Sequence, residues 1–168
     1  MGKLIISQFS NQYDVRRMTE GDVDEILNLC VQNKQYYEFC QADTSREQIL
    51  NDIRITPPGK QLSDKYYVGY YLNGVLIAIM DLIDGYPDED IAFIGFFMMN
   101  ANYQGKGTGS EIITELATYL KDLGFTAIQL GIDKGNPQST HFWAKNSFLI
   151  LKEIEQEQGV ILYAERKL

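Results

Sequence analysis

The run Gln-Gly-Lys-Gly-Thr-Gly at residues 104–109 constrains the fold more than any other part of the chain. An apolar run from Ile91 to Met99, typical of a buried β-strand, precedes it, and apolar residues at helical spacing follow it. Three glycines within five residues allow positive φ angles and close backbone approach. Several N–H groups can then point at one anion at the positive end of a helix dipole. The pattern predicts a pyrophosphate site, with a plain strand-to-helix turn as the alternative.

Two common phosphate-binding motifs do not fit this glycine run. A Walker A loop needs Ser or Thr directly after Gly-Lys, where this chain has Gly107. The dinucleotide fingerprint needs a third glycine where the chain has Ser110, and an acidic residue where it has Gln129 and Leu130. The glycine run alone therefore leaves the ligand open.

A second block, from Asn136 to Phe148, narrows the choice of ligand. It reads Asn-Pro-Gln-Ser-Thr-His-Phe-Trp-Ala-Lys-Asn-Ser-Phe and begins 27 residues after Gly109. Together the two blocks resemble the GNAT superfamily of acetyl-coenzyme A-dependent N-acetyltransferases over residues 91–148. The matching positions of the second block are Asn136, Ser139, Trp143, Lys145, Ser147 and Phe148. Three of them depart from the usual residue, since Ser139 replaces Ala, Trp143 replaces Tyr and Ser147 replaces Gly.

The resemblance implies a single N-acetyltransferase domain over residues 1–168, of the α/β (α+β) class. Its central sheet would be mixed and mostly antiparallel, splayed beside the strand that precedes the glycine run, and flanked by helices. The pantetheine arm of acetyl-CoA or coenzyme A would enter the opening as an extra strand. The residues expected to bind this cofactor are Phe97, Met98, Met99, Gln104, Gly105, Lys106, Gly107, Thr108, Gly109, Ser110, Asn136, Trp143 and Lys145.

The resemblance also implies direct transfer of the acetyl group to a primary amine in a ternary complex. The backbone N–H of Met98, at a bulge in its strand, would donate to the oxyanion. Trp143 stands where many relatives carry the Tyr that protonates the thiolate, and an indole is not a practical proton source. A thiol of pKa about 8.5 leaves well without strong acid assistance. The general acid and base stay unassigned; Glu89, Asp90 and Asp133 are candidate bases, although each is typical of a solvated loop carboxylate.

Two other functions fit the same residues. The missing Tyr is compatible with a non-catalytic acyl-CoA-binding or interaction module, and the same scaffold would also suit another acyl-CoA donor. His141, the single histidine of the chain, is interpreted as a surface or packed helix residue without a catalytic role.

The partner that the resemblance implies is an amine acceptor, either a small molecule or a protein. The connection between the first two helices contains Tyr36, Tyr37 and Glu38, which can bind a cation through ring faces and charge. A weaker candidate for the acceptor rim combines an aromatic residue with carboxylates: Tyr86 with Asp84, Asp88 and Glu89. Packing is the more ordinary role of such aromatic residues.

Charge and hydropathy exclude several classes of partner. The formal net charge is −8, from 15 basic and 23 acidic residues without a basic cluster, which disfavours a nucleic acid partner. The sequence has no run of 18 apolar residues and no signal-type N-terminus, which predicts a cytoplasmic protein without a membrane partner. Cys30, Cys40 and a single histidine cannot form a structural zinc site, so no metal is expected and the thiols are predicted to be reduced. A terminal hairpin with exposed edges would allow a homodimer.

The remaining pattern predicts the element order β-α-α-β-β-β-α-β-α-β-β. The expected strands are residues 14–18, 66–72, 75–83, 91–99, 127–132, 148–154 and 160–165. Helices are expected after Thr19, after Thr44, after the glycine run and over residues 137–145. Asn73-Gly74 predicts a type I′ hairpin turn. One buried helix face is predicted from Ile112, Ile113, Leu116, Leu120 and Leu123, with Gly124 ending that helix.

Overall fold

The described strands form one mixed sheet in this computed structural model, which describes residues 4–34, 36 and 44–168. They are β1 (Asp14–Arg17), β2 (Lys65–Leu72), β3 (Val75–Asp84), β4 (Ile91–Met99), β5 (Ala127–Asp133), β6 (Leu149–Gln156) and β7 (Gly159–Lys167). The strand order is β1-β2-β3-β4-β5-β7-β6. Among the described strands β4 and β5 pair in parallel, and all other neighbours are antiparallel. The predicted fold class is therefore confirmed.

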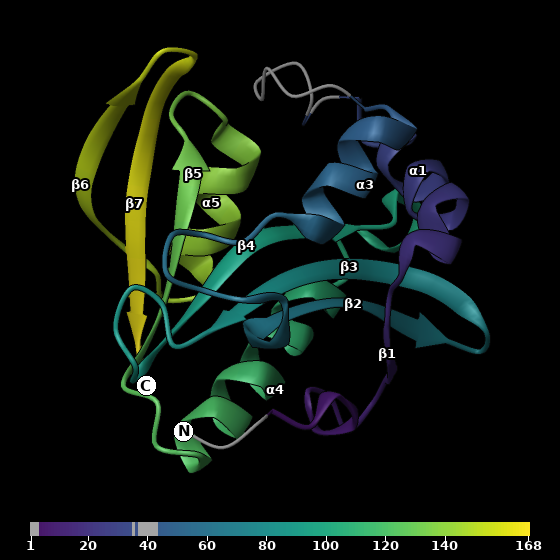
Figure 1. The fold of residues 1–168 in the computed structure, drawn as a ribbon, viewed down its shortest axis with the longest axis horizontal. Helices are drawn as coiled ribbons and strands as arrows, with labels where there is room; N and C mark the ends of the chain where they lie inside the picture. Colours follow the sequence, from purple (N-terminus) through teal and green to yellow (C-terminus); the bar gives the residue numbers. More distant parts are fainter. Residues whose placement is uncertain (1–3, 35, 37–43) are drawn as a thin grey trace.

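Helices cover both faces of this sheet (Figure 1). They are α1 (Val23–Val31), α3 (Arg46–Arg54), α4 (Thr108–Asp122) and α5 (Pro137–Lys145), with short 3-10 turns at Ile6–Gln8, Glu20–Asp22, Leu62–Asp64 and Ala101–Tyr103. On one face α1 and α3 form a core with Ile79 and Met98 of the sheet. On the other face α4 and α5 pack over Ile77 and Ile94. In the described part of the chain, no helix combines the length and apolarity needed to cross a bilayer.

The turn and the helix cap that the sequence predicts are formed at the expected residues. Asn73 and Gly74 have φ angles of 51° and 79°, as a type I′ turn requires, and they join β2 to β3. Ser45 caps α3, because its hydroxyl accepts a hydrogen bond from the Gln48 N–H at 3.1 Å. These turns and caps explain why the element boundaries lie close to those expected from the sequence.

Leu123 is a residue of the predicted helix face that the structure places elsewhere. The other four members, Ile112, Ile113, Leu116 and Leu120, are fully buried, whereas Leu123 is 45% exposed. Gly124, at φ 94°, turns the chain back after α4, and the Phe125 N–H then bonds to the Leu120 carbonyl at 3.0 Å. Phe125 is buried and takes the core position that the helical spacing predicted for Leu123.

The outer strand β6 is the exposed edge of the sheet. Leu149, Ile150 and Leu151 are 72%, 50% and 54% exposed. Its pairing with β7 skips one residue, because Ile150 pairs with Ala164 and Lys152 with Tyr163, so that Leu151 forms a bulge. β6 and β7 form the terminal hairpin that the sequence predicted.

The parallel strands β4 and β5 separate partway along their length. They pair over Ile91–Ile94 and Ala127–Leu130, and β4 then continues to Met99 beside β3 alone. Figure 1 shows the two strands diverging in this region. The pairing with β3 contains a bulge at Gly95, since Ile94 and Phe96 face consecutive residues of β3. The splay agrees with the prediction, but the bulge precedes Met98 by three residues instead of lying beside it.

Candidate active site

The glycine run forms the turn between β4 and α4, and its glycines serve two purposes. Gly105 and Gly107 have φ angles of 73° and 83°, and a β-carbon at either would meet no atom within 4 Å. Glycine is needed there for backbone conformation. At Gly109 the reason is close packing, because a β-carbon would lie 3.2 Å from the Phe142 ring. This contact joins the two sequence blocks at the start of α4.

The first turn of α4 presents backbone donors without helical partners. The Glu111 N–H bonds to the Gly107 carbonyl at 3.0 Å, so the N–H groups of Thr108, Gly109 and Ser110 have no acceptor within the helix. The 15-residue helix adds partial positive charge at this end. This geometry fits a phosphate or pyrophosphate group.

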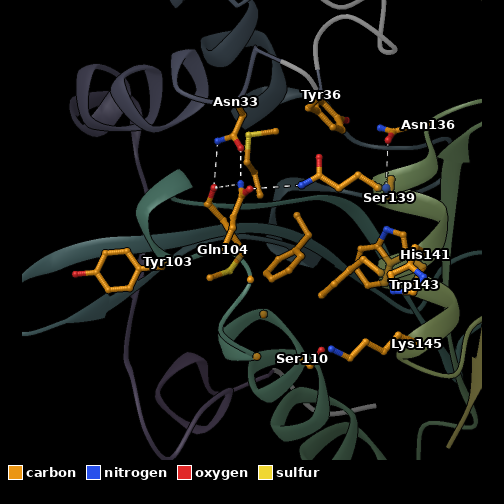
Figure 2. Close-up of a pocket in the computed structure, with 18 residues that line it drawn as sticks. Asn33, Tyr36, Tyr103, Gln104, Ser110, Asn136, Ser139, His141, Trp143 and Lys145 are labelled. Carbon is orange, nitrogen blue, oxygen red and sulfur yellow. Dashed lines mark hydrogen bonds between the residues drawn. The ribbon is translucent and has the colours of Figure 1, made fainter.

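A cavity of about 310 Å³ lies between the glycine run, the end of β4 and α5 (Figure 2). The predicted site residues that line it are Tyr36, Phe97, Met98, Met99, Gln104, Gly105, Gly107, Gly109, Ser110, Asn136, Trp143 and Lys145. Lys106 and Thr108 are outside the lining; Lys106 is exposed, with its Nζ 5.8 Å from the centre of the Tyr103 ring. Tyr37 and Glu38 lie outside the described residues.

Several lining residues were not predicted as cofactor ligands: Asn33, Tyr103, Gln138, Ser139, His141 and Phe142. Those from α5 lie within the second sequence block, and helical spacing could have found Ser139, four residues before Trp143, once Trp143 was chosen. Asn33 follows α1 and has no sequence signal, because only the packing of α1 brings it to the glycine run.

The walls of the cavity come from α5 and β4. Asn136 is 2% exposed and caps α5, with its Oδ1 accepting from the Ser139 N–H at 3.1 Å. In Figure 2 the Lys145 side chain points toward Ser110 from the opposite wall. Lys145 therefore brings a positive charge to the end of α4 that has free N–H groups.

Trp143 belongs to an aromatic cluster behind the cavity. It is 7% exposed, and its ring centre lies 5.9 Å from that of Phe97, 4.8 Å from Phe142 and 5.0 Å from Phe148. Phe97 and Phe142 also stack at 5.9 Å. The cluster joins β4 to α5 and holds the apolar wall of the cavity in place.

Asn33 and Gln104 form a hydrogen-bond network at the end of β4 (Figure 2). Gln104 Nε2 donates to Asn33 Oδ1 at 2.6 Å and to the Met99 carbonyl at 3.2 Å. Asn33 Nδ2 donates to the same carbonyl at 3.1 Å. Gln138 Nε2 lies 3.4 Å from Gln104 Oε1, at the limit of a hydrogen bond. The network fixes the first residue of the glycine run against β4 and the end of α1.

Replacement of Asn33 by Ala should weaken coenzyme A binding by about 1 kcal/mol, roughly fivefold in Kd. Gln104 would lose its shortest hydrogen bond and the glycine run its link to α1. Isothermal titration calorimetry with coenzyme A measures the effect. Gln138→Ala is the matched control, because it removes only the weakest contact of Gln104, and it should leave the Kd nearly unchanged. Equal effects of the two variants would contradict this role of Asn33.

The direction of the β4 backbone groups follows from the ladder with β3. The Asn100 N–H donates to the Ile77 carbonyl on β3 at 2.8 Å. Because alternate residues of a strand face the same neighbour, the Met98 N–H also faces β3. The N–H groups of Phe97 and Met99 then face the open side, where β5 has separated. The backbone donors available at the fork are therefore those next to Met98.

The acidic residues considered as bases lie at different ends of the sheet. Glu89 and Asp90 precede β4 at the end opposite the glycine run, and Asp90 Oδ2 accepts from Thr126 Oγ1 at 2.7 Å. At about 3.3 Å per residue, the strand places Asp90 roughly 20 Å from Phe97. Asp133 ends β5 on the side of the fork. Among the described residues, no three His, Cys, Asp or Glu side chains are grouped to hold a metal ion.

The aromatic candidates for acceptor binding are also separated. Tyr36 lines the cavity, and its ring packs edge-on against Phe96 at 6.1 Å. Tyr86 packs edge-on against Phe93 at 5.4 Å, near the start of β4. The cavity thus includes Tyr36 but not Tyr86 or its neighbouring carboxylates.

Residues 25–148 match the acetyltransferase (GNAT) family. The chain therefore belongs to the GNAT acetyltransferase family, as the two sequence blocks predicted, and the family agrees with the predicted use of acetyl-CoA. No match was found among curated proteins.

Solved structures share the fold over nearly the whole chain. An acetyltransferase from Thermus thermophilus has a TM-score of 0.75 at 16% identity, covering 94% of this chain and 97% of that chain. The PaiA N-acetyltransferase from Thermoplasma acidophilum, in complex with coenzyme A, has a TM-score of 0.68 at 17% identity, covering 93% and 99%. A mutant spermidine N-acetyltransferase from Vibrio cholerae has a TM-score of 0.62 at 20% identity, covering 94% and 95%.

Proposed function

We propose that the protein transfers the acetyl group of acetyl-CoA directly to a primary amine in a ternary complex. The observation that carries the proposal is the fork between β4 and β5, which ends at the free N–H groups of the α4 N-terminus. An extended pantetheine arm fits the fork, and its pyrophosphate fits the glycine run. The proposed cofactor contacts are the cofactor residues expected from the sequence that also line the cavity: Phe97, Met98, Met99, Gln104, Gly105, Gly107, Gly109, Ser110, Asn136, Trp143 and Lys145.

The backbone N–H of Phe97 is the better candidate for the oxyanion donor. The sequence assigned this role to Met98, but the ladder with β3 directs the Met98 N–H away from the fork. Phe97 directs its N–H to the open side, and its side chain is held by Phe142 and Trp143. A fixed backbone donor stabilises negative charge without reorganisation during the reaction.

The leaving group needs no protein acid in this proposal. Trp143 is buried among aromatic rings and offers no transferable proton. A thiol of pKa about 8.5 departs readily as thiolate. Orientation of the amine against the thioester can supply about 7–11 kcal/mol when the alignment is good. Positioning and the oxyanion donor therefore account for most of the proposed catalysis.

The acceptor is proposed to be a cationic amine on a small molecule or a protein. Tyr36 at the cavity rim supplies a ring face for a cation, and the acidic surface charge favours its approach. One relative with this fold is named a spermidine N-acetyltransferase, which makes spermidine a sensible first acceptor. A cytoplasmic location and a homodimer stay predictions.

Thermal unfolding with acetyl-CoA, coenzyme A and NAD tests the proposal first, since a ligand of the native state raises the midpoint. We expect both coenzyme A species, but not NAD, to raise Tm. Thiol release is then measured with spermidine and a lysine peptide. Binding without thiol release for any amine would favour the non-catalytic acyl-CoA module, and release only with a longer acyl-CoA would favour another donor. An unchanged Tm at millimolar ligand would contradict the proposal.

A further inference from the structure

A buried ion pair lies on the sheet face that α1 and α3 cover. Lys65 Nζ on β2 donates to Asp81 Oδ2 on β3 at 2.6 Å, and the two residues are 3% and 9% exposed. The second carboxylate oxygen, Asp81 Oδ1, is buried and has no hydrogen-bond partner among the described residues. Buried oxygens of this kind are rare, because desolvation without a donor is costly. Asp81 thus keeps one carboxylate oxygen that can accept a hydrogen bond or a proton.

The bulge of β4 makes room for this carboxylate. Asp81 pairs with Phe96, and Gly95 is the extra residue of the bulge. A β-carbon at Gly95 would lie 2.9 Å from Asp81 Oδ2, so any larger residue would displace the carboxylate. Gly95 directly follows Ile94, the last β4 residue that pairs with β5. The Asp81 carboxylate thus lies over β4 at the point where the fork opens.

The same face leads from Asp81 to the cavity. Phe96 and Met98 belong with Ile79 to the core under α1 and α3; Met98 lines the cavity, and Phe96 contacts Tyr36, which also lines it. Two strand residues, about 7 Å, separate Gly95 from Phe97. Asp81 pairs with Phe96 on the sheet face from which an amine beside Tyr36 would approach β4, although Asp81 itself is not among the residues that line the cavity.

We propose that Asp81 is the general base of the reaction, an assignment that rests on the proposed function. Its Oδ1 accepts one proton from the acceptor ammonium, which leaves a neutral amine and a carboxylic acid. The amine nitrogen forms a bond to the thioester carbonyl carbon, the C–S bond breaks, and a second proton passes from nitrogen to the thiolate. The carboxylic acid then returns its proton to water.

The surroundings of Asp81 suit this role. Lys65 on β2 pairs with it, Tyr67 is its register partner on β2, and Asp52 on α3 is close enough to interact with it electrostatically. Burial raises the pKa of Asp81 and Asp52 adds to the rise, while the Lys65 cation opposes it. Burial also raises the pKa of Tyr67, which stays neutral. A raised pKa makes a carboxylate a better acceptor for a proton from an amine of pKa about 10.

The test compares thiol release by wild type and Asp81→Asn with whichever of spermidine and the lysine peptide wild type accepts. We expect kcat to fall about 10²- to 10⁴-fold near neutral pH and to recover in part near pH 10, where free amine becomes abundant. The Kd of coenzyme A should not change. Asp122→Asn, at the end of α4 remote from the cavity, is the matched control and should keep kcat within about threefold.

A second variant separates catalysis from structure. Lys65→Met removes the cation that lowers the pKa of Asp81, so the acidic limb of the rate profile should move to higher pH while turnover persists above it. If Asp81→Asn fails to fold, Lys65→Gln with Asp81→Asn removes both charges together and must show the same loss of kcat.

The outcomes distinguish this inference from the function on which it rests. If wild type releases no thiol with any amine, the proposed function fails and the assignment of Asp81 falls with it. If wild type is active but folded Asp81→Asn keeps kcat within about threefold, the assignment of Asp81 alone is overturned. The assignment of Asp81 would also be overturned if the acidic limb of the pH–rate profile lay at the same pH in Lys65→Met as in wild type.

Discussion

Gly107→Glu should abolish coenzyme A binding, with a Kd at least about 100-fold higher than that of wild type. Gly107 has a φ of 83°, where a residue with a β-carbon costs about 1–2 kcal/mol. The new carboxylate would also lie where the phosphates of the cofactor are proposed to bind, and opposed like charges cost several kcal/mol. Calorimetry with coenzyme A measures the Kd.

Gly124→Glu controls for both the strain and the added charge. Gly124 has a φ of 94°, and a β-carbon there would meet no atom within 4 Å, as at Gly107. It lies at the other end of α4, away from the cavity. This variant should lose similar stability but bind coenzyme A normally. Equal Kd values for the two variants would indicate that the glycine run is only a structural turn and does not bind the phosphates of the cofactor.

Trp143→Ala should destabilise the protein by about 3–5 kcal/mol, the usual cost of removing a large buried aromatic side chain. The substitution leaves a void against Phe97, Phe142 and Phe148, and these rings connect β4 to α5. Trp143→Tyr keeps most of the packing, so cofactor affinity should persist and turnover should stay or rise. Urea denaturation gives the free energy of unfolding.

Leu123→Ala is the control for the Trp143 variants. Leu123 is 45% exposed beyond the end of α4, so its truncation should change stability by less than about 0.5 kcal/mol. Comparable destabilisation by Trp143→Ala and Leu123→Ala would show that the aromatic cluster is not important for the fold. A tenfold or greater loss of turnover in folded Trp143→Tyr would show instead that the indole has a role in the reaction.

Features encoded by neighbouring residues were predictable from the sequence. The type I′ turn needs only Asn73 and Gly74, and the glycine run needs positive φ at Gly105 and Gly107. The family resemblance added the fork between β4 and β5, because it identified the strand order that periodicity alone does not give. Together these signals located most of the residues that line the cavity.

The features missed by sequence reasoning depend on contacts between distant segments. Asn33 reaches Gln104 only because α1 packs over the end of β4, 71 residues away. Asp81 lies over Gly95 because of a bulge in the pairing of β3 with β4, and no spacing along either strand indicates that register. Leu123 fits the helical spacing of the buried residues, but the chain turns at Gly124. Phe125 is therefore buried in the position predicted for Leu123, and Leu123 is exposed. In each case the position of the residue depends on how segments pack in the folded chain, which the local sequence pattern does not show.

The bulge at Leu151 limits how the sheet can grow. β6 leaves its outer backbone groups unpaired, yet the extra residue breaks the even spacing that a further strand would need. The exposed Leu149, Ile150 and Leu151 are therefore available to a neighbour through their side chains more readily than through main-chain pairing. This geometry disfavours continuous strand pairing between copies of the chain, which would lead to fibres. It still allows a contact through side chains at the same edge.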